Sequence, residues 1–269
     1  MPELPEVETV VRTLRPHLTG RSVMAIQHLR ADMLRPAGFD LSTQIVGRPI
    51  AGIVRRAKRI VFNFSNGQEF YIHLGMTGRL SVEDTAAPLV KHTHLLANLD
   101  NGRQLRFVDP RRFGEIVWLG GAGHVGVGPE PLGLKAADLL KQLRRTGRPI
   151  KAALLDQGVI AGIGNIYADE ALHRAALHPL RPANTLNSDE VGRLNRAIKQ
   201  VLNQAIKAGG SSIRDYVNAD GDRGAFQVSH KVYDREGEPC RGCRGLIVRI
   251  VLGGRSTHFC PTCQPEVKL

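Results

Sequence analysis

Four cysteines near the C-terminus constrain this chain more than any other feature of its sequence. They form two Cys-x-x-Cys pairs, made by Cys240, Cys243, Cys260 and Cys263, and the chain has no other cysteine. Two such pairs at this separation can supply four thiolates to one tetrahedral Zn²⁺. Between the pairs the sequence predicts a strand over 246–252, a Gly-Gly turn and a return strand over 256–259. This pattern is typical of a zinc ribbon.

Two disulfides or an iron–sulfur cluster could use the same cysteines. The N-terminus begins Met1-Pro2-Glu3 and lacks the basic start and apolar stretch of a signal peptide. No apolar run is long enough to span a membrane, so we expect a cytoplasmic protein with no membrane partner. Because a reducing compartment disfavours disulfides, we predict one structural Zn²⁺. Four cysteine ligands leave no open position for a substrate.

The charge of the chain points to a polyanionic partner. The formal net charge is +12 over 269 residues. Lysines and arginines that neutralise phosphates release condensed counterions, so a surplus of this size favours nucleic acid binding. The alternative is a merely basic housekeeping protein.

The hydrophobic pattern of residues 1–132 is mostly that of β-structure after one opening helix over 3–18. Short strands separated by tight turns suggest a β-sandwich. The strands are expected over residues 23–29, 50–54, 60–64, 70–74, 94–99, 105–108 and 116–119.

A stretch rich in Gly and Pro over 120–133 marks a domain boundary, and helical periodicity follows it. Ser188 is the expected N-cap of the last helix, and residues 209–230 are expected to form a long, mobile loop. Helices are expected over residues 136–145, 150–156, 166–175 and 189–208. The fold class is therefore α+β and multidomain, divided into residues 1–132, 133–228 and 229–269.

A glycine-rich turn over 161–165 precedes the third of these helices. Such a turn can present free N–H groups to a phosphate, although many glycine turns are only structural. Asn165 could cap the helix or hydrogen-bond a phosphate, and Lys151 lies on the helix before it.

A second polar segment, residues 109–114, combines Arg111 and Arg112 with Phe113. These residues could form a surface salt-bridge cluster, or a wedge in which Phe enters a duplex and Arg pairs with an orphaned base. Met76 lies in another glycine-rich segment and is by default a core residue.

Pro2 suits the first position of a helix, because its missing N–H would be unpaired there. Removal of Met1 would also leave Pro2 with a free secondary amine. Such an amine condenses with a sugar aldehyde carbon to give a cationic iminium, an electron sink that acidifies the neighbouring C–H.

Taken together, these segments resemble the bacterial formamidopyrimidine-DNA glycosylase family over the whole chain. The resemblance rests on five segments in the family's order: residues 1–8, 73–80, 109–114, 162–172 and 237–264. It implies a β-sandwich domain, a helix–two-turn–helix domain and a four-cysteine zinc finger. It also implies a monomeric glycosylase and AP lyase of base excision repair, nucleoid-associated in a bacterium. Such an enzyme excises oxidised purines such as 8-oxoguanine from damaged double-stranded DNA and cleaves the strand by β,δ-elimination.

The resemblance also implies a role for each matched residue. Pro2 would be the Schiff-base nucleophile, Glu3 the proton donor, and Glu6 a support for the site. Lys58 would donate a proton during elimination, and Arg255 would do so in δ-elimination while contacting a phosphate. The residues matched to DNA contacts are Met76, His92, Arg111, Phe113, Lys151 and Asn165. The loop over 218–227 would fold over the everted base.

The chain departs from the family pattern at Asp234 and Arg244, where glycine is expected in both cases. Asp234 adds a carboxylate near the lesion loop. Two related readings stay open at this point. One is an endonuclease VIII-like glycosylase for oxidised pyrimidines, and the other is a lesion-binding paralogue without catalysis.

Overall fold

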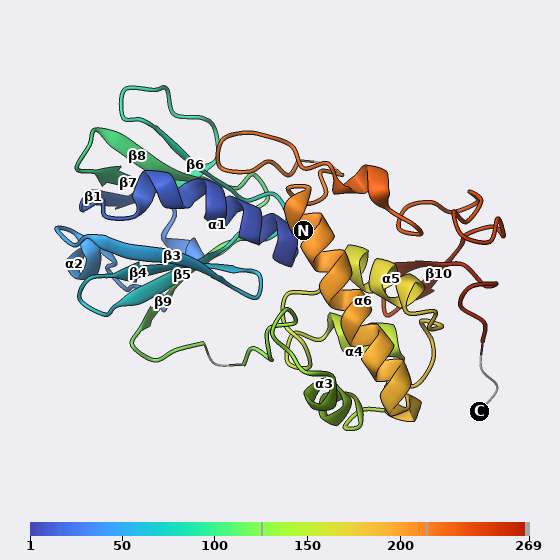
Figure 1. Cartoon of the computed structure of the whole chain (residues 1–269). Helices are drawn as coiled ribbons and strands as arrows, with labels where there is room; N and C mark the ends of the chain where they lie inside the picture. The colour runs from blue at the N-terminus through green and yellow to red at the C-terminus, as the bar shows by residue number, and fades with distance from the viewer. Residues whose placement is uncertain (125, 214, 267–269) are drawn as a thin grey trace. The chain divides into compact units, whose positions relative to one another are not determined.

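The computed structural model describes residues 1–124, 126–213 and 215–266. By contact, the chain forms two compact units, one made of Met1–Val125 with Ala208–Ala225 and the other of Gly126–Lys207 with Phe226–Leu269 (Figure 1). The segment over 208–225 therefore belongs with the N-terminal unit, although it follows the last long helix. The division into three domains at 132 and 228 stays a prediction.

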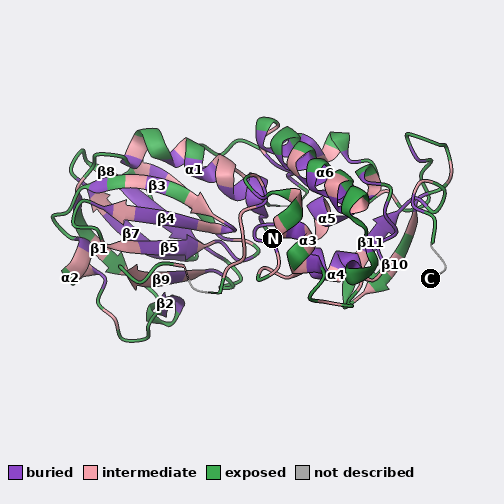
Figure 2. Ribbon diagram, turned by 60° about the horizontal axis from the view of Figure 1, so that its bottom comes forward, coloured by how far each residue is buried: buried purple, intermediate pink, exposed green. Residues whose placement is uncertain are grey.

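The first unit contains two sheets that enclose a common apolar core. One sheet is antiparallel with the order β1-β7-β8-β6, and its strands are β1 (Val23–His28), β7 (Thr93–Leu99), β8 (Arg103–Val108) and β6 (Arg79–Asp84). The other has the order β2-β9-β5-β4-β3, with β2 (Leu34–Arg35), β9 (Glu115–Gly120), β5 (Glu69–His73), β4 (Arg59–Phe64) and β3 (Ile50–Arg56). Only the pairing of β2 with β9 is parallel among these described strands. Buried side chains of both sheets, such as Phe62 and Phe107, meet in one core. Figure 2 colours the buried residues along these strands purple. The predicted β-sandwich is confirmed.

Helix α1 (Leu4–Leu18) covers this core with its apolar stripe, and the short helix α2 (Ser42–Ile45) follows later. The predicted strands are found, each within a few residues of its expected limits, but β2 and β6 were missed. Strand β6 reads RLSVED and buries only Leu80 and Val82. Two alternating apolar residues among charges are too few to predict a strand.

The second unit contains the helical part of the chain and the ribbon. Its main helices are α3 (Ala136–Leu143), α4 (Ile150–Leu155), α5 (Asn165–Arg174) and α6 (Ser188–Lys207). Strands β10 (Val248–Leu252) and β11 (Arg255–Phe259) form the predicted hairpin around Gly253-Gly254. Short 3₁₀ turns lie at Ala31–Met33, Ala183–Thr185 and Phe226–Ser229. Within the described ranges, no helix is long and apolar enough to cross a membrane.

The N-terminus of α6 differs from the prediction. Ser188 is already helical, and Asn187 is the residue that caps. The Asn187 side chain accepts the N–H of Glu190 at 2.9 Å, and the Glu190 carboxylate accepts the N–H of Asn187 at 2.8 Å. This reciprocal pair satisfies donors that the start of a helix leaves unpaired. Asn and Ser are both favourable N-cap residues. Asn187 is the one with an acid three residues later, Glu190, and this spacing forms the capping box.

The two departures from the family pattern lie at strained backbone positions. Asp234 has φ of 59° and Arg244 has φ of 68°. This left-handed region costs an ordinary side chain about 1–2 kcal/mol but costs glycine nothing, and Asp tolerates it better than Arg. The expectation of glycine at both positions therefore has a conformational basis, and Arg244 carries the larger penalty.

We expect Arg244→Gly to stabilise the zinc-loaded protein by about 1 kcal/mol, because glycine removes this backbone strain. A gain of that size raises the midpoint of thermal unfolding by about 2–4 °C. Arg244→Ala is the matched control, since it removes the same side chain but keeps the Cβ. Equal midpoints for the two variants would contradict the explanation.

Candidate active site and zinc centre

The N-terminal residues Pro2, Glu3 and Glu6 are all buried, whereas the side chain of Met1 is 53% exposed. Glu3 is the N-cap of α1 and forms a capping box with Glu6, whose Oε2 accepts the Glu3 N–H at 2.8 Å. In the full chain the Pro2 nitrogen is an amide and has no basic lone pair. Removal of the accessible Met1 turns it into an amine beside two buried carboxyl groups.

The second oxygen of Glu6 reaches the segment that returns from the end of α6. Glu6 Oε1 accepts the N–H of Ser211 at 2.7 Å. A Cβ on Gly210 would lie 2.7 Å from the same oxygen, and Gly210 has φ of 83°, so only glycine suits this position. Tyr216 donates its hydroxyl hydrogen to the Glu6 carbonyl at 3.1 Å, and burial raises the pKa of Tyr216. The segment predicted as a loop is thus a loop with specific contacts to α1.

Lys58 lies in the tight turn between β3 and β4 and is only 6% exposed. The residue before it, Ala57, has φ of 55°. The Arg55 guanidinium donates to the Ala57 carbonyl at 3.1 Å and to the Glu8 carboxylate at 3.1 Å. Because Glu8 belongs to α1, this ion pair ties the Lys58 turn to the helix that follows Pro2 and Glu3.

Asp109 organises the loops that carry the predicted wedge. It is fully buried, and its two oxygens accept the Thr77 hydroxyl at 2.5 Å and the Gly114 N–H at 2.8 Å. Its backbone carbonyl lies 2.8 Å from His94 Nε2, and its N–H donates to the carbonyl of His92 at 3.0 Å. The Asp109 carboxylate therefore joins the loop after β5 to the loop after β8, and the Asp109 backbone adds the residue before β7. The sequence analysis included Asp109 in the segment over 109–114 but predicted no role for it.

The wedge residues lie at the surface of this framework. Met76 is 41% exposed, so the default expectation of a core methionine is wrong, and Phe113 is 55% exposed. The Arg111 guanidinium lies 4.6 Å from the centre of the Phe113 ring. Gly75 permits this arrangement, because a Cβ there would lie 2.4 Å from the carbonyl carbon of Phe113. His92 is exposed with φ of 67°. The structure thus brings together Met76, Arg111, Phe113 and His92.

The predicted phosphate-binding residues of the second unit converge on one carbonyl. Lys151 Nζ donates to the Ser256 carbonyl at 2.6 Å, and Asn165 Nδ2 donates to the same oxygen at 2.9 Å. Arg255, at the exposed tip of the hairpin, is the neighbouring residue. Asn165 is the first residue of α5 and its side chain does not cap the helix, so that alternative is wrong. Its side chain instead joins the glycine turn to the ribbon.

Lys151 is not an exposed side chain that could bind a phosphate directly. It is completely buried, and Nζ lies 2.7 Å from Asp169 Oδ1 and 2.9 Å from the Thr257 hydroxyl. An ammonium committed to these partners positions the hairpin tip. Asp169 also accepts the N–H of His258 at 2.9 Å. Sequence reasoning missed Asp169 and the buried Glu170, because acids on a helix ordinarily face water and no local pattern marks these two as exceptions.

Lys151→Met is expected to cost about 3–5 kcal/mol, because it leaves the Asp169 carboxylate buried without its cation. The measurement is urea unfolding followed by far-ultraviolet circular dichroism. Unfolding of the first unit, followed separately by the fluorescence of Trp118, should keep nearly the same urea midpoint. Lys141→Met is the control, since Lys141 and Asp138 form an exposed pair, and we expect it to cost under about 0.5 kcal/mol. Equal costs for the two lysines would contradict the buried-pair account.

The zinc centre is built as the sequence predicted. One Sγ from each of Cys240, Cys243, Cys260 and Cys263 lies within 4.8 Å of all the others, and none of these cysteines forms a disulfide. Burial opposes ionisation of Cys240, but the N–H groups of Cys243 and Gly242 and the side chain of His173 outweigh it and lower its pKa to about 7. Burial and the neighbouring sulfurs raise the pKa of Cys263. Four thiolates this close need a cation, and one structural Zn²⁺ satisfies them.

Comparison with known proteins finds matches to one family in three segments of the chain. Residues 1–116 match the formamidopyrimidine-DNA glycosylase N-terminal domain, residues 127–217 the formamidopyrimidine-DNA glycosylase H2TH domain, and residues 237–265 the zinc finger found in FPG and IleRS. The formamidopyrimidine-DNA glycosylases of Desulforamulus reducens and Laribacter hongkongensis are 46% and 44% identical. Each comparison covers 98% of this chain, with 99% and 100% of the respective relative.

Solved structures give the same result. A mutant Lactococcus lactis FPG bound to Fapy-dG containing DNA superposes with a TM-score of 0.92 at 36% identity, over 98% of this chain and 100% of that one. MutM in complex with carbocyclic 8-oxo-G containing DNA superposes with a TM-score of 0.90 at 36% identity and the same coverage. The chain belongs to the formamidopyrimidine-DNA glycosylase family and is a DNA glycosylase of base excision repair.

Proposed function

We propose that this protein excises oxidised purines from double-stranded DNA and then cleaves the strand at the resulting abasic site. The observation that carries the proposal is the N-terminus, where Pro2 lies buried beside Glu3 and Glu6 behind an accessible Met1. The solved relatives bound to Fapy-dG and 8-oxo-G support the substrate class. Their oxidised-purine ligands favour it over the oxidised pyrimidines of an endonuclease VIII-like enzyme.

The chemistry begins when the Pro2 amine forms a bond to C1′ of the damaged nucleotide and the glycosidic bond breaks. The electron pair of that bond leaves with the base, which takes up the proton that the Pro2 nitrogen loses. As the base leaves, Glu3 protonates the sugar ring oxygen, so the ring opens and a cationic iminium joins Pro2 to the sugar. The iminium acidifies the neighbouring C–H. Loss of that proton expels the 3′ phosphate, and a second elimination expels the 5′ phosphate, with Lys58 and Arg255 as proton donors.

The lesion must leave the base stack before this chemistry can occur. Exposed Met76 and Phe113 would fill the vacated space, while Arg111 would pair with the orphaned base. The remaining DNA contacts would be made to phosphates by His92, Asn165 and Arg255, with Lys151 holding the carbonyl that Asn165 shares. A single damaged nucleotide needs one copy of these parts, so the protein acts as a monomer. It works in the cytoplasm, at the nucleoid.

The first test is borohydride trapping on a duplex with one 8-oxoguanine opposite cytosine. We expect a covalent protein–DNA band from the wild type and a sharp fall in Pro2→Gly, which replaces the secondary amine of proline by a primary amine on a more flexible residue. If protein shown by mass to lack Met1 and to hold one zinc gives no band with any damaged base, the enzyme proposal fails. A lesion-binding paralogue would then remain.

Glu3→Gln separates base release from the reaction of Pro2 with an abasic site. It keeps the Pro2 amine but cannot donate a proton, so base release from 8-oxoguanine should fall by about 10²–10⁴-fold. Trapping on DNA with a preformed abasic site should persist, because no base has to be released there. Loss of both activities in a folded variant would argue against the separate roles.

Phe113→Ala tests the wedge. We expect kcat/KM for 8-oxoguanine in duplex DNA to fall by about tenfold, because unstacking a base step costs a few kcal/mol that the ring helps to offset. Cleavage of a preformed abasic site should fall less. The matched control is Met24→Ala, which truncates a side chain that is 56% exposed, like the 55% of Phe113. A similar loss in both variants would count against the wedge.

A further inference from the structure

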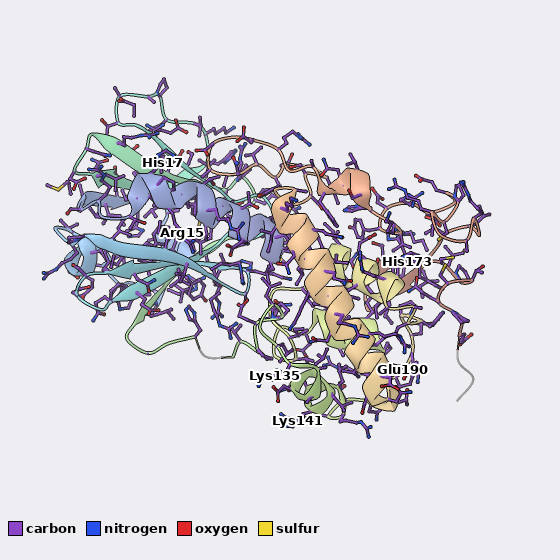
Figure 3. The ribbon with its side chains drawn as sticks, viewed as in Figure 1. Arg15, His17, Lys135, Lys141, His173 and Glu190 are labelled. Atoms are coloured by element: carbon purple, nitrogen blue, oxygen red, sulfur yellow. The ribbon has the colours of Figure 1, made fainter. Side chains whose placement is uncertain are left out.

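His173 lies in the last turn of α5 (Figure 3), outside the ribbon and outside the set of four cysteines. Its Nε2 is 3.6 Å from Sγ of Cys240. This distance suits an N–H···S hydrogen bond, since sulfur is a larger acceptor than oxygen. The contact joins a helix of the helical part of the second unit to the first zinc ligand in the chain.

The direction of this hydrogen bond follows from the metal chemistry. A cysteine that binds zinc is a thiolate and has no proton to donate. The shared hydrogen must therefore be on Nε2 of His173. The N–H of Gly242 donates to the same sulfur at 3.4 Å, so the completely buried Cys240 receives two hydrogen bonds besides its metal.

Two carboxylates on α5 fix the helix from which His173 reaches the sulfur. One turn earlier, Asp169 accepts the N–H of His258 at 2.9 Å. The Glu170 carboxylate accepts the N–H groups of Lys231, Val232 and Tyr233 at 2.9–3.0 Å. These carboxylates hold the chain shortly before Cys240 and shortly before Cys260, and thereby keep the His173 ring close to Cys240.

We propose that His173 donates its Nε2–H to the zinc-bound thiolate of Cys240 and thereby slows the loss of zinc. It is a positioning residue. The hydrogen bond spreads the negative charge of the sulfur and keeps the thiolate directed at the metal. Partners of this kind around metal ligands typically change metal affinity by about 10–100-fold.

The test compares the zinc-loaded full chain with two variants, His173→Phe and His173→Gln, by the rate of zinc transfer to a chromogenic chelator. Phe keeps a ring but removes the donor, so zinc release should be about tenfold faster. Gln offers an amide N–H at similar reach and should recover much of the wild-type rate. The control is His178→Gln, whose ring packs edge-on against Phe259, next to Cys260, and should leave the rate unchanged.

A second measurement needs no mutation. Nitrogen–proton correlation spectra of the zinc-loaded wild type report which ring nitrogen of His173 carries hydrogen, and we expect Nε2. A hydrogen on Nδ1 alone, or zinc release from His173→Phe at the wild-type rate, would overturn the proposal. So would X-ray absorption showing a nitrogen ligand, because His173 would then bind the metal directly. If His173→Phe does not fold, the Gln variant and the spectra still decide.

Discussion

Both oxygens of the Glu6 carboxylate accept backbone N–H groups, one from Glu3 and one from Ser211, and the side chain is almost completely buried. A buried carboxylate with one donor removed is costly, so the two contacts stabilise each other. The residues they fix are far apart in sequence. Glu3 adjoins Pro2, the proposed nucleophile, and Ser211 lies in the segment that leads to the loop over 218–227, which is proposed to fold over the lesion. One side chain therefore joins the start of α1 to the segment that returns from α6.

The second unit repeats this use of buried acids. Helix α5 carries Asp169 and Glu170, which hold the ribbon through backbone N–H groups and through Lys151. The other end of the same helix carries Asn165, which bonds to the carbonyl beside Arg255. A small ribbon has little apolar core of its own, and a metal with a polar anchor compensates for that. The groups that would grip phosphates are thus held by the contacts that hold the zinc module.

Periodicity and ligand spacing were enough to predict helix α1, most of the strands and the four zinc ligands, because each depends on a local pattern. The parts that escaped prediction depend on tertiary contacts. Lys151 was predicted as a DNA contact, and only the fold shows that it pairs with the buried Asp169. Asp109 belonged to a recognised motif, but its bonds to Thr77 and Gly114 come from two different loops. The glycine expectation at Arg244 came from resemblance, and its reason became visible only with the backbone angle.

Gly75 and Gly210 have a genetic consequence. Each adopts a positive φ and lies where a Cβ would meet another atom at 2.4 Å or 2.7 Å, respectively. A glycine codon is GG followed by any base, so every missense change at either of its first two letters adds at least a Cβ. At both sites, therefore, the only single-base changes that keep glycine are those at the third letter of the codon. A single miscopied guanine at either of the first two letters would disturb the Gly75–Phe113 contact or the Glu6 contact, so the gene of this repair glycosylase is itself sensitive to damage at these guanines.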